Sequence, residues 1–273
     1  MTSVVDGDVE TTHGRIAYLD SGGPGAVALL IHGNSACKEI FQHQFESRLV
    51  NRFRLIALDL PGHGASSDAN EPERTYTIPG YADVVLELLS ALGVEHLAIF
   101  GWSLGGHVGI ELLSRDLDVA GLAITGTPPI GHNPADFAAG FRPQEHMQLT
   151  GKEDFSEADI AAYARETAGT PAPFLDAAVR RTDGRARRLM FEAAMAARGA
   201  DQRQVASTSP VPIAVITGAH EPFVDNAFLT TFPYRNLWDR TVHVMPDTGH
   251  APFWERPQAF NPLFERFLTD VLS

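Results

Sequence analysis

Leu97-Ala-Ile-Phe-Gly-Trp-Ser-Leu-Gly-Gly106 is the stretch of sequence that decides the fold. Four apolar residues lead into the pattern Gly101-x-Ser103-x-Gly105, and a run of helical type follows it. A strand, a sharp turn with a serine and a helix are the context in which this pattern forms a nucleophile elbow. The turn is so tight that glycines must flank the serine, and its strained backbone exposes the hydroxyl above the sheet. The sequence therefore predicts Ser103 as a nucleophile.

Apolar runs of the same type recur along the chain and alternate with helical patterns. Continuous apolar runs are typical of parallel strands that are buried on both faces. Their alternation with helices indicates an α/β fold, with a mostly parallel central sheet and helices on both faces. We expect a hairpin from Asp8–Thr12 and Arg15–Leu19, strands at Ala26–Ile31, Leu55–Leu58, Leu122–Ile124, Ile213–Ile216 and Val242–Met245, and helices at Tyr81–Leu92, Leu104–Arg115 and Pro262–Leu272.

The alternation stops between about Ile130 and Ser209, where helical patterns follow one another without a clear strand. Function in open α/β sheets lies at the carboxyl ends of the strands, where this insertion emerges. The sequence therefore favours a core of residues 1–129 and 210–273 with a helical cap, or lid, of residues 130–209. A small separate domain without a role in the chemistry is the alternative. Helices are expected at Ser156–Ala168, which opens with a capping-box pattern, at Pro173–Arg181 and at Arg185–Ala197.

The composition limits which partners the protein can bind and in which cellular compartment it is expected. The chain has 273 residues, a formal net charge of −13 and one cysteine, Cys37. Such acidity argues against nucleic acid or an anionic membrane surface as a partner. A lone cysteine permits no intramolecular disulfide, and neither a signal peptide nor a membrane-spanning run is visible. We therefore expect a cytoplasmic protein that acts on a small molecule; its oligomeric state stays open.

A serine hydroxyl needs a base that takes its proton, usually a histidine that is held by a carboxylate. His250 follows the last expected strand and precedes the last helix, where a loop can return it to the serine. Glu221 follows the penultimate strand, as expected for the order serine, acid, histidine. Asp247 is expected to be a turn residue, and Asp225 a helix N-cap. The residues predict a triad of Ser103, Glu221 and His250, and leave Asp225 open as the acid.

Two backbone N–H groups are expected to form an oxyanion hole beside the serine. His32-Gly33-Asn34 follows the strand that ends at Ile31, and the N–H of Asn34 is assigned as one donor. The N–H of Leu104, next after the serine, is the other. His32 and His63 are expected to shape their loops through hydrogen bonds rather than to react. No spacing typical of a zinc site is present, so the sequence predicts neither a metal nor a cofactor.

Beyond these motifs, the sequence resembles the metal-independent N-acyl homoserine lactonases of the α/β-hydrolase fold, which quench bacterial quorum signals. The resemblance implies this fold with an inserted cap, Glu221 as the triad acid, a Tyr163 hydroxyl that binds the substrate amide, and Met147 in an acyl tunnel. It extends through nearly the whole chain and rests on Ile31-His-Gly-Asn-Ser35, Asp59-Leu-Pro-Gly-His-Gly64, Phe100-Gly-Trp-Ser-Leu-Gly-Gly-His107, Ile124-Thr-Gly-Thr-Pro-Pro129, Arg181-Thr-Asp-Gly-Arg-Ala-Arg-Arg188, Glu221-Pro-Phe-Val224 and Gly249-His-Ala-Pro-Phe253.

Bulky apolar residues of the cap could line a tunnel for a fatty acyl chain over the serine, although each is individually more typical of a cap core. Trp102 and Phe223 adjoin the catalytic residues in sequence and are further candidates for substrate binding. The basic cluster Arg181–Arg188 is expected to be a solvated face with local ion pairs. The cap candidates are Phe137, Phe141, Met147, Phe155, Tyr163, Phe174, Met190 and Met195.

The motifs and the resemblance together predict a serine hydrolase that opens the lactone ring of N-acyl homoserine lactones through an acyl-enzyme. The nearest alternative is a general carboxylesterase, or another lactonase, that acts on a small acyl ester with the same triad. A ligand receptor without activity is more distant, because such receptors often lose a triad member. A hydrolase of carbon–carbon bonds also stays open.

Overall fold

A β-sheet forms the centre of the fold. In the computed structural model, which describes residues 4–143 and 149–273, this sheet has eight strands: β1 (Val5–Thr11), β2 (Gly14–Asp20), β3 (Val27–Ile31), β4 (Arg54–Leu58), β5 (His96–Trp102), β6 (Asp118–Thr125), β7 (Ile213–Gly218) and β8 (His243–Met245). Their order across the sheet is β1-β2-β4-β3-β5-β6-β7-β8. The pairs β1–β2 and β2–β4 are antiparallel, and the other pairs are parallel. The expected fold class is confirmed.

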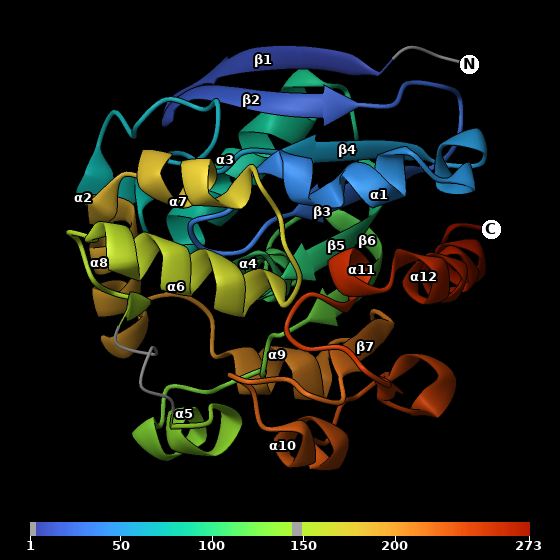
Figure 1. Cartoon of the computed structure of the whole chain (residues 1–273). Coiled ribbons are helices and arrows are strands. Elements are labelled where there is room, and N and C mark those ends of the chain that lie inside the picture. The colour runs from blue at the N-terminus through green and yellow to red at the C-terminus, as the bar shows by residue number, and fades with distance from the viewer. Residues whose placement is uncertain (1–3, 144–148) are drawn as a thin grey trace.

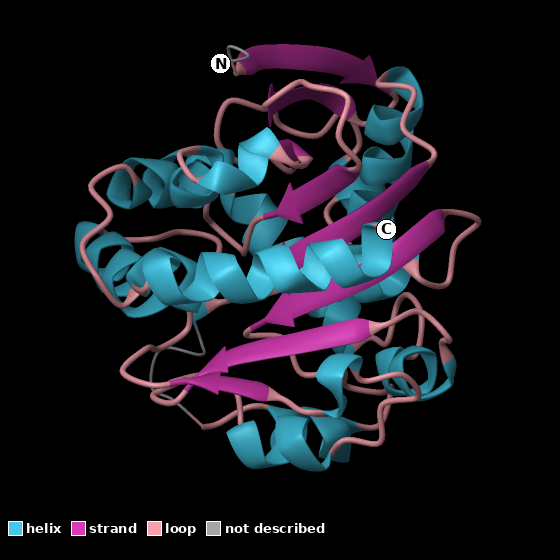
Figure 2. Cartoon of the chain, turned by 90° about the vertical axis from the view of Figure 1, so that its right-hand side faces the viewer, coloured by secondary structure: helices cyan, strands magenta, loops and turns pink. Residues whose placement is uncertain are grey.

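The sheet is buried on both faces because successive side chains of a strand point to opposite sides. In β3, Leu29 and Ile31 belong to one apolar core, and Ala28 and Leu30 to the other. Helices α3 (Ile78–Ala91) and α4 (Leu104–Leu112) cover the first core, and α12 (Pro257–Leu272) covers the second. Figure 2 shows α12 lying across the strands. This double burial explains why the parallel strands read as continuous apolar runs.

Between β6 and β7 the described chain is helical, as the sequence predicts. Figure 1 shows α6, α7 and α8 together beyond the ends toward which β4 and β5 point. The capping box at Ser156 forms, because its hydroxyl accepts the Asp159 N–H and the Asp159 carboxylate accepts the Ser156 N–H. The division of the chain at residues 130 and 209 stays a prediction. The helices here are α5 (Pro134–Gly140), α6 (Glu157–Ala168), α7 (Leu175–Arg181), α8 (Gly184–Met195) and α9 (Gln202–Thr208).

Helix ends differ from the expected ones by a few residues. Helix α3 begins three residues before Tyr81, because the Thr77 side chain accepts the Gly80 N–H as an N-cap. Helix α12 begins at Pro257 and contains Pro262, the residue at which the sequence placed its start. The shorter helices are η1 (Lys38–Phe41), α1 (Gln42–Phe45), η2 (Arg48–Asn51), α2 (Pro72–Thr75), α10 (Asn226–Thr231), η4 (Trp238–Arg240) and α11 (Pro252–Glu255).

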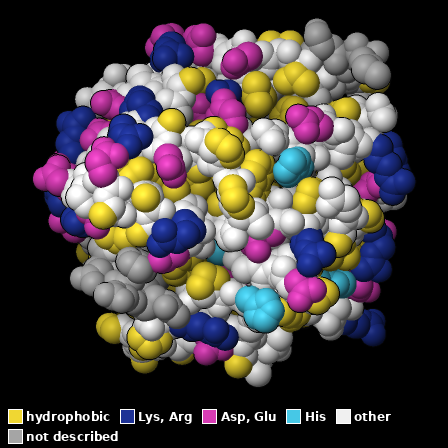
Figure 3. All heavy atoms as spheres, in the orientation of Figure 1, with side chains coloured by type: hydrophobic (Ala, Val, Ile, Leu, Met, Phe, Trp, Pro, Cys, Tyr) yellow, Lys and Arg dark blue, Asp and Glu magenta, His cyan; other side chains and the backbone are white. Residues whose placement is uncertain are grey.

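The surface carries charges of both signs. On the face that Figure 3 shows, described acidic and basic side chains lie interspersed rather than in separate fields. Among the helices of the described residues, none combines the length and the apolar character that crossing a bilayer would require.

Candidate active site

Ser103 lies at the end of β5, where the chain turns sharply into α4. It is the N-cap of that helix, with φ 54° and ψ −117°, a backbone conformation that side chains rarely adopt. The two flanking glycines have no room for a side chain. A Cβ on Gly105 would lie 2.0 Å from the Ile31 carbonyl oxygen, and one on Gly101 would lie 2.4 Å from the Gly105 oxygen. The close packing of backbone around the turn therefore holds the predicted elbow geometry.

His250 and Glu221 form a buried pair at the ends of neighbouring strands. The Nδ1 atom of His250 lies 2.9 Å from each carboxylate oxygen of Glu221, and both side chains are almost completely buried. The carboxylate also accepts the backbone N–H of Phe223 at 2.9 Å. A carboxylate in this position holds the histidine in the tautomer whose Nε2 can accept a proton.

Neither Asp225, which the sequence left open as the acid, nor Asp247 pairs with His250. Asp225 is the N-cap of α10, and its carboxylate accepts the backbone N–H groups of Ala227 and Phe228. Asp247 lies at a turn with φ 54° and faces Arg256. The structure thus brings Glu221 to the histidine.

The loop that carries His250 is fitted closely to its neighbours. A Cβ on Gly126, which has φ 64°, would lie 2.4 Å from the His250 ring. The indole N–H of Trp102 donates to the His250 carbonyl oxygen at 2.9 Å. The described residues contain no hydrogen bond between the Ser103 hydroxyl and the His250 ring, although both line the same pocket. In enzymes without bound substrate such contacts are often long and tighten when substrate binds.

The predicted oxyanion donors lie in two segments next to the serine. Leu104 begins α4, and the first N–H groups of a helix have no partner within it. Asn34 lies in the loop after β3, with its side-chain amide bound to the Thr150 carbonyl oxygen at 3.0 Å. A Cβ on the preceding Gly33 would lie 3.2 Å from Cβ of Ser103, so this loop passes directly beside the serine. Two N–H groups in these places could stabilise an oxyanion.

Two buried histidines near the site act on loops, as expected. The His32 Nε2 atom accepts the Leu60 N–H at 3.0 Å, and its Nδ1 atom faces the Gly33 carbonyl oxygen at 2.7 Å. Burial lowers the pKa of His32 and, further, that of His63, so both rings are neutral. The Nδ1 atom of His63 is hydrogen-bonded to the Pro61 carbonyl oxygen at 3.0 Å. These rings hold the loops after β3 and β4.

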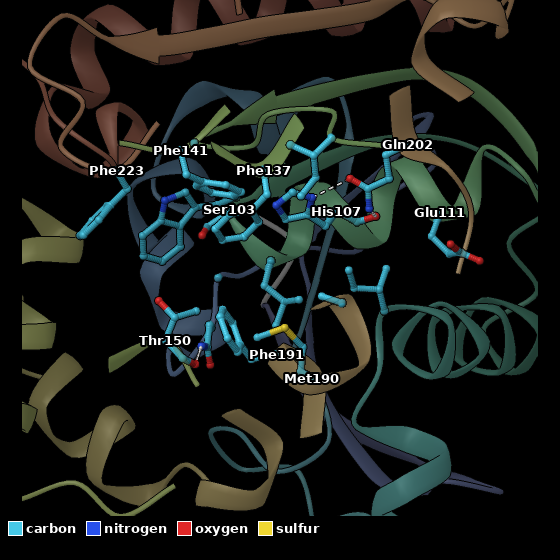
Figure 4. A pocket seen from close by; sticks show the side chains of 18 of the residues that line it. Ser103, His107, Glu111, Phe137, Phe141, Thr150, Met190, Phe191, Gln202 and Phe223 are labelled. Atoms are coloured by element: carbon cyan, nitrogen blue, oxygen red, sulfur yellow. Dashed lines mark hydrogen bonds between the residues drawn. The ribbon is translucent and has the colours of Figure 1, made fainter. Parts of the chain in front are cut away.

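A pocket of about 1230 Å³, counted with its open mouth, reaches from Ser103 and His250 into the space under the helices between β6 and β7. Trp102, Tyr163 and Phe223, three of the predicted substrate-binding residues, line it. The Phe223 ring stands edge-on to His250, with 4.9 Å between the ring centroids. Figure 4 shows phenylalanine rings on several sides of Ser103. Met147, the fourth predicted residue, lies outside the described residues.

The predicted tunnel residues divide into two groups. Phe137, Phe141, Tyr163 and Met190 line the pocket, as expected. Phe155, Phe174 and Met195 are not among its lining residues. Phe155 packs against Arg187 and Tyr163, Phe174 packs against Trp254, and Met195 is exposed. For Phe155 and Phe174 the alternative interpretation as packing residues of the cap core is correct, whereas the exposed Met195 fits neither interpretation.

The basic cluster Arg181–Arg188 is a solvated face only in part. Arg181, Arg185 and Arg188 form exposed ion pairs, as expected. Arg187 is 3% exposed and donates to the Ser35 hydroxyl and to the carbonyl oxygens of Lys152 and Glu153. Burial lowers the pKa of its guanidinium. The expectation is wrong at this position because α8 turns Arg187 inward, over the Phe155 ring.

Several lining residues were missed as site residues by sequence reasoning, three of them beside the residues already described. His107, Phe191 and Gln202 line the pocket, from α4, α8 and α9. His107 had a detectable signal, because it follows Ser103 by four residues and therefore lies on the same face of a helix. Helix α9 was not predicted, so Gln202 had none.

A model of the alpha/beta hydrolase family matches residues 28–263, most of the chain. The chain belongs to this family. Two solved structures to which the hydrolase is similar are of the N-acyl homoserine lactonase AidH. A variant of AidH with N-hexanoyl homoserine is 44% identical, with a TM-score of 0.96 over 98% of both chains. AidH with N-butanoyl homoserine is 45% identical, with a TM-score of 0.95 over 98% of this chain and 97% of that one. The resemblance to this group of lactonases is confirmed.

Curated sequences are more distant from the hydrolase. A pimeloyl-[acyl-carrier protein] methyl ester esterase of Neisseria meningitidis is 28% identical, with 89% of this chain and 77% of the esterase covered. An uncharacterized protein of Mycobacterium tuberculosis is 37% identical over 101 residues. That match covers 37% of this chain and only 28% of the mycobacterial protein. The proteins to which the hydrolase is similar thus carry names with different substrates.

Proposed function

We propose that this hydrolase opens the lactone ring of N-acyl homoserine lactones, with Ser103, His250 and Glu221 as its catalytic triad. One observation carries the proposal: Ser103, in its strained turn, and His250, held by the buried Glu221, line the same largely apolar pocket. The similarity to AidH over almost the whole chain supports the substrate class, because AidH structures hold N-acyl homoserines.

The reaction follows from the roles of these groups. His250 Nε2 takes the proton of the Ser103 hydroxyl, and Oγ attacks the lactone carbonyl carbon. The N–H groups of Asn34 and Leu104 stabilise the oxyanion that forms. When the ester bond of the ring breaks, His250 returns the proton to the leaving alkoxide, which stays attached to the acyl-enzyme as a free hydroxyl. A water molecule activated by His250 then releases N-acyl homoserine and restores Ser103.

The pocket suits the proposed substrate. Homoserine lactones are uncharged, and the rings of Phe137, Phe141 and Phe223 offer an apolar surface for a fatty acyl chain. Tyr163 lies close to the oxyanion loop, with its hydroxyl 3.4 Å from the Asn34 carbonyl oxygen. Burial raises the pKa of this hydroxyl, so it stays protonated and can donate to the substrate amide. We further propose that residues 130–209 act as the cap and that the protein is cytoplasmic.

The nearest alternative is hydrolysis of simple acyl esters, which the pimeloyl methyl ester esterase relative favours. The test is mass spectrometry of ring opening for unsubstituted lactones with acyl chains of four to twelve carbons, beside p-nitrophenyl esters of the same chains. We expect the lactones to have the higher kcat/KM and EDTA to leave the rates unchanged. Higher kcat/KM for the simple esters would make the protein a carboxylesterase. Tight lactone binding without ring opening would indicate a receptor, and inhibition by EDTA would indicate a metal-dependent lactonase.

A further inference from the structure

A polar pair lies on the wall of the pocket, one helical turn beyond the nucleophile. His107, from α4, and Gln202, from α9, both line the pocket. His107 Nδ1 lies 2.7 Å from the Gln202 side-chain oxygen, and the Gln202 amide group donates to the His107 backbone oxygen at 3.3 Å. The proposed mechanism uses neither residue. An acyl chain alone would offer this polar pair no hydrogen-bonding partner, so we consider what else it could bind.

The two hydrogen bonds fix the state of the His107 ring. Because the amide nitrogen of Gln202 is directed to a carbonyl oxygen, its oxygen is directed to His107 and must accept a hydrogen bond from Nδ1–H. The other ring nitrogen, Nε2, then carries a lone pair. Burial lowers the pKa of His107, which keeps the ring neutral. His107 is therefore a hydrogen-bond acceptor toward anything that meets Nε2.

The free nitrogen is directed into the pocket. Figure 4 shows the bond from His107 to Gln202 on one side of the ring and the second ring nitrogen turned toward Ser103 and Phe137. No described residue makes a hydrogen bond to this nitrogen. The Phe141 ring is also close, with its centroid 6.3 Å from that of His107. Among such apolar neighbours, a donor on the ligand would be the partner of Nε2.

The position along the pocket selects one atom of the acyl chain. Ser103, His107 and Glu111 all line the pocket from one face of α4, so the pocket follows this helix away from the nucleophile. His107 is four residues from Ser103, a rise of about 6 Å along the helix axis. Three bonds of an extended chain span about 3.8 Å, so the five bonds from the lactone carbonyl carbon to the third acyl carbon span roughly 6 Å. An acyl chain that follows α4 from the nucleophile would therefore bring its third carbon level with His107.

We propose that His107 accepts a hydrogen bond from a hydroxyl on the third acyl carbon, so that the enzyme prefers N-(3-hydroxyacyl) homoserine lactones. This inference rests on the proposed lactonase function. An unsubstituted chain leaves the Nε2 lone pair without a donor. A 3-oxo chain places a second acceptor against it, which is worse. One hydrogen bond of ordinary net strength corresponds to roughly 3- to 10-fold in kcat/KM.

The test measures kcat/KM for N-octanoyl, N-(3-hydroxyoctanoyl) and N-(3-oxooctanoyl) homoserine lactone. In the wild type we expect the hydroxy form first, the unsubstituted form second and the oxo form last. In His107→Phe, which keeps a ring but has no acceptor, the ratio of hydroxy to unsubstituted should fall to about one. In Gln202→Leu, which frees the tautomer, the ratio should fall part of the way. Met190→Leu, a change in the apolar wall, should leave the ratio unchanged.

Ratios within one enzyme cancel a general loss of activity, and the wild-type panel alone can overturn the inference if a variant does not fold. Ring opening of all three lactones with a wild-type ratio of one or less would reject the role of His107 and leave the lactonase function standing. A wild-type preference that persists in His107→Phe would place hydroxyl recognition on another residue. No ring opening of any lactone would reject the lactonase function itself.

Discussion

The sheet edge and the helices between β6 and β7 enclose the same pocket, but they hold their residues in different ways. At the sheet edge, the backbone packs so closely around Ser103 and His250 that a Cβ on Gly105 or Gly126 would overlap its neighbours. On the helical side, bulky side chains pack on one another, as Phe137 does on Phe141 with 4.7 Å between the ring centroids. The predicted chemical groups are thus placed by the backbone, and the wall of the pocket by side-chain packing.

Because of this difference, we expect substitutions in the two regions to have different effects. A change at the sheet edge should alter the chemical step for every substrate, because the same groups act on each. A change in the helical wall should alter which acyl chains fit, or how firmly the wall is held over the sheet. Substitutions in each region test whether these effects are in fact distinct.

The largest effect is expected for Ser103→Ala. The change removes the proposed nucleophile and fits the space that the serine leaves, so turnover should fall by roughly 10⁴- to 10⁶-fold while the fold persists. Lactone ring opening measures the first part, and thermal unfolding followed by circular dichroism measures the second. Retained turnover in a folded variant would show that another group attacks the substrate.

A smaller effect is expected for Glu221→Gln, with Asp225→Asn as its matched control. The amide of glutamine cannot stabilise the His250 imidazolium, so kcat should fall by about 10²- to 10⁴-fold. Asparagine is as good an N-cap as aspartate, so Asp225→Asn should leave kcat within about twofold. Both variants lose one negative charge, so a general electrostatic effect would appear in both. A larger loss in Asp225→Asn would move the acid to that residue.

The sheet edge could be predicted from the sequence because its physics is local. A parallel strand buried on both faces is continuous in apolar residues, and the carboxyl ends of such strands meet at one edge. Hence the turn at Ser103 and the loops after β7 and β8 could be assigned to one site before the structure was known. Spacing alone left Asp225 open, because an acidic residue before a helix can either cap it or pair with a histidine.

The helical wall could be predicted only in outline. The capping box at Ser156 predicted where α6 begins, but which phenylalanines face the pocket depends on how the helices pack on one another. Phe155 and Phe174 pack against other residues, and Phe191 lines the pocket although no sequence pattern distinguishes it. Arg187 was misassigned for a related reason. Arginine is rarely buried unless its donors are satisfied, and its acceptors lie far away in sequence.

The smallest of the three effects concerns this arginine. Arg187 joins the two regions, because it donates to Ser35, which follows Asn34 in the proposed oxyanion loop, and to the backbone at Lys152 and Glu153. In Arg187→Met the side chain stays long but becomes apolar, and these acceptors lose their donor. We expect the free energy of unfolding to fall by about 2–4 kcal/mol, because buried acceptors that have lost their partners destabilise the folded state. We also expect kcat to fall by about tenfold, because the loop that carries Asn34 is held less firmly.

Arg188→Met is the matched control, one residue along the same helix. Its guanidinium pairs with Glu153 and Glu192 at the surface, and exposed pairs contribute little, so the loss should stay below about 1 kcal/mol. Urea denaturation gives the unfolding free energies, and ring opening at saturating lactone gives kcat. A stability loss without a change in kcat would mean that Arg187 only holds the helices together. A loss of kcat in Arg187→Met alone would show that the helical wall also positions the oxyanion loop, so the two regions would not be independent.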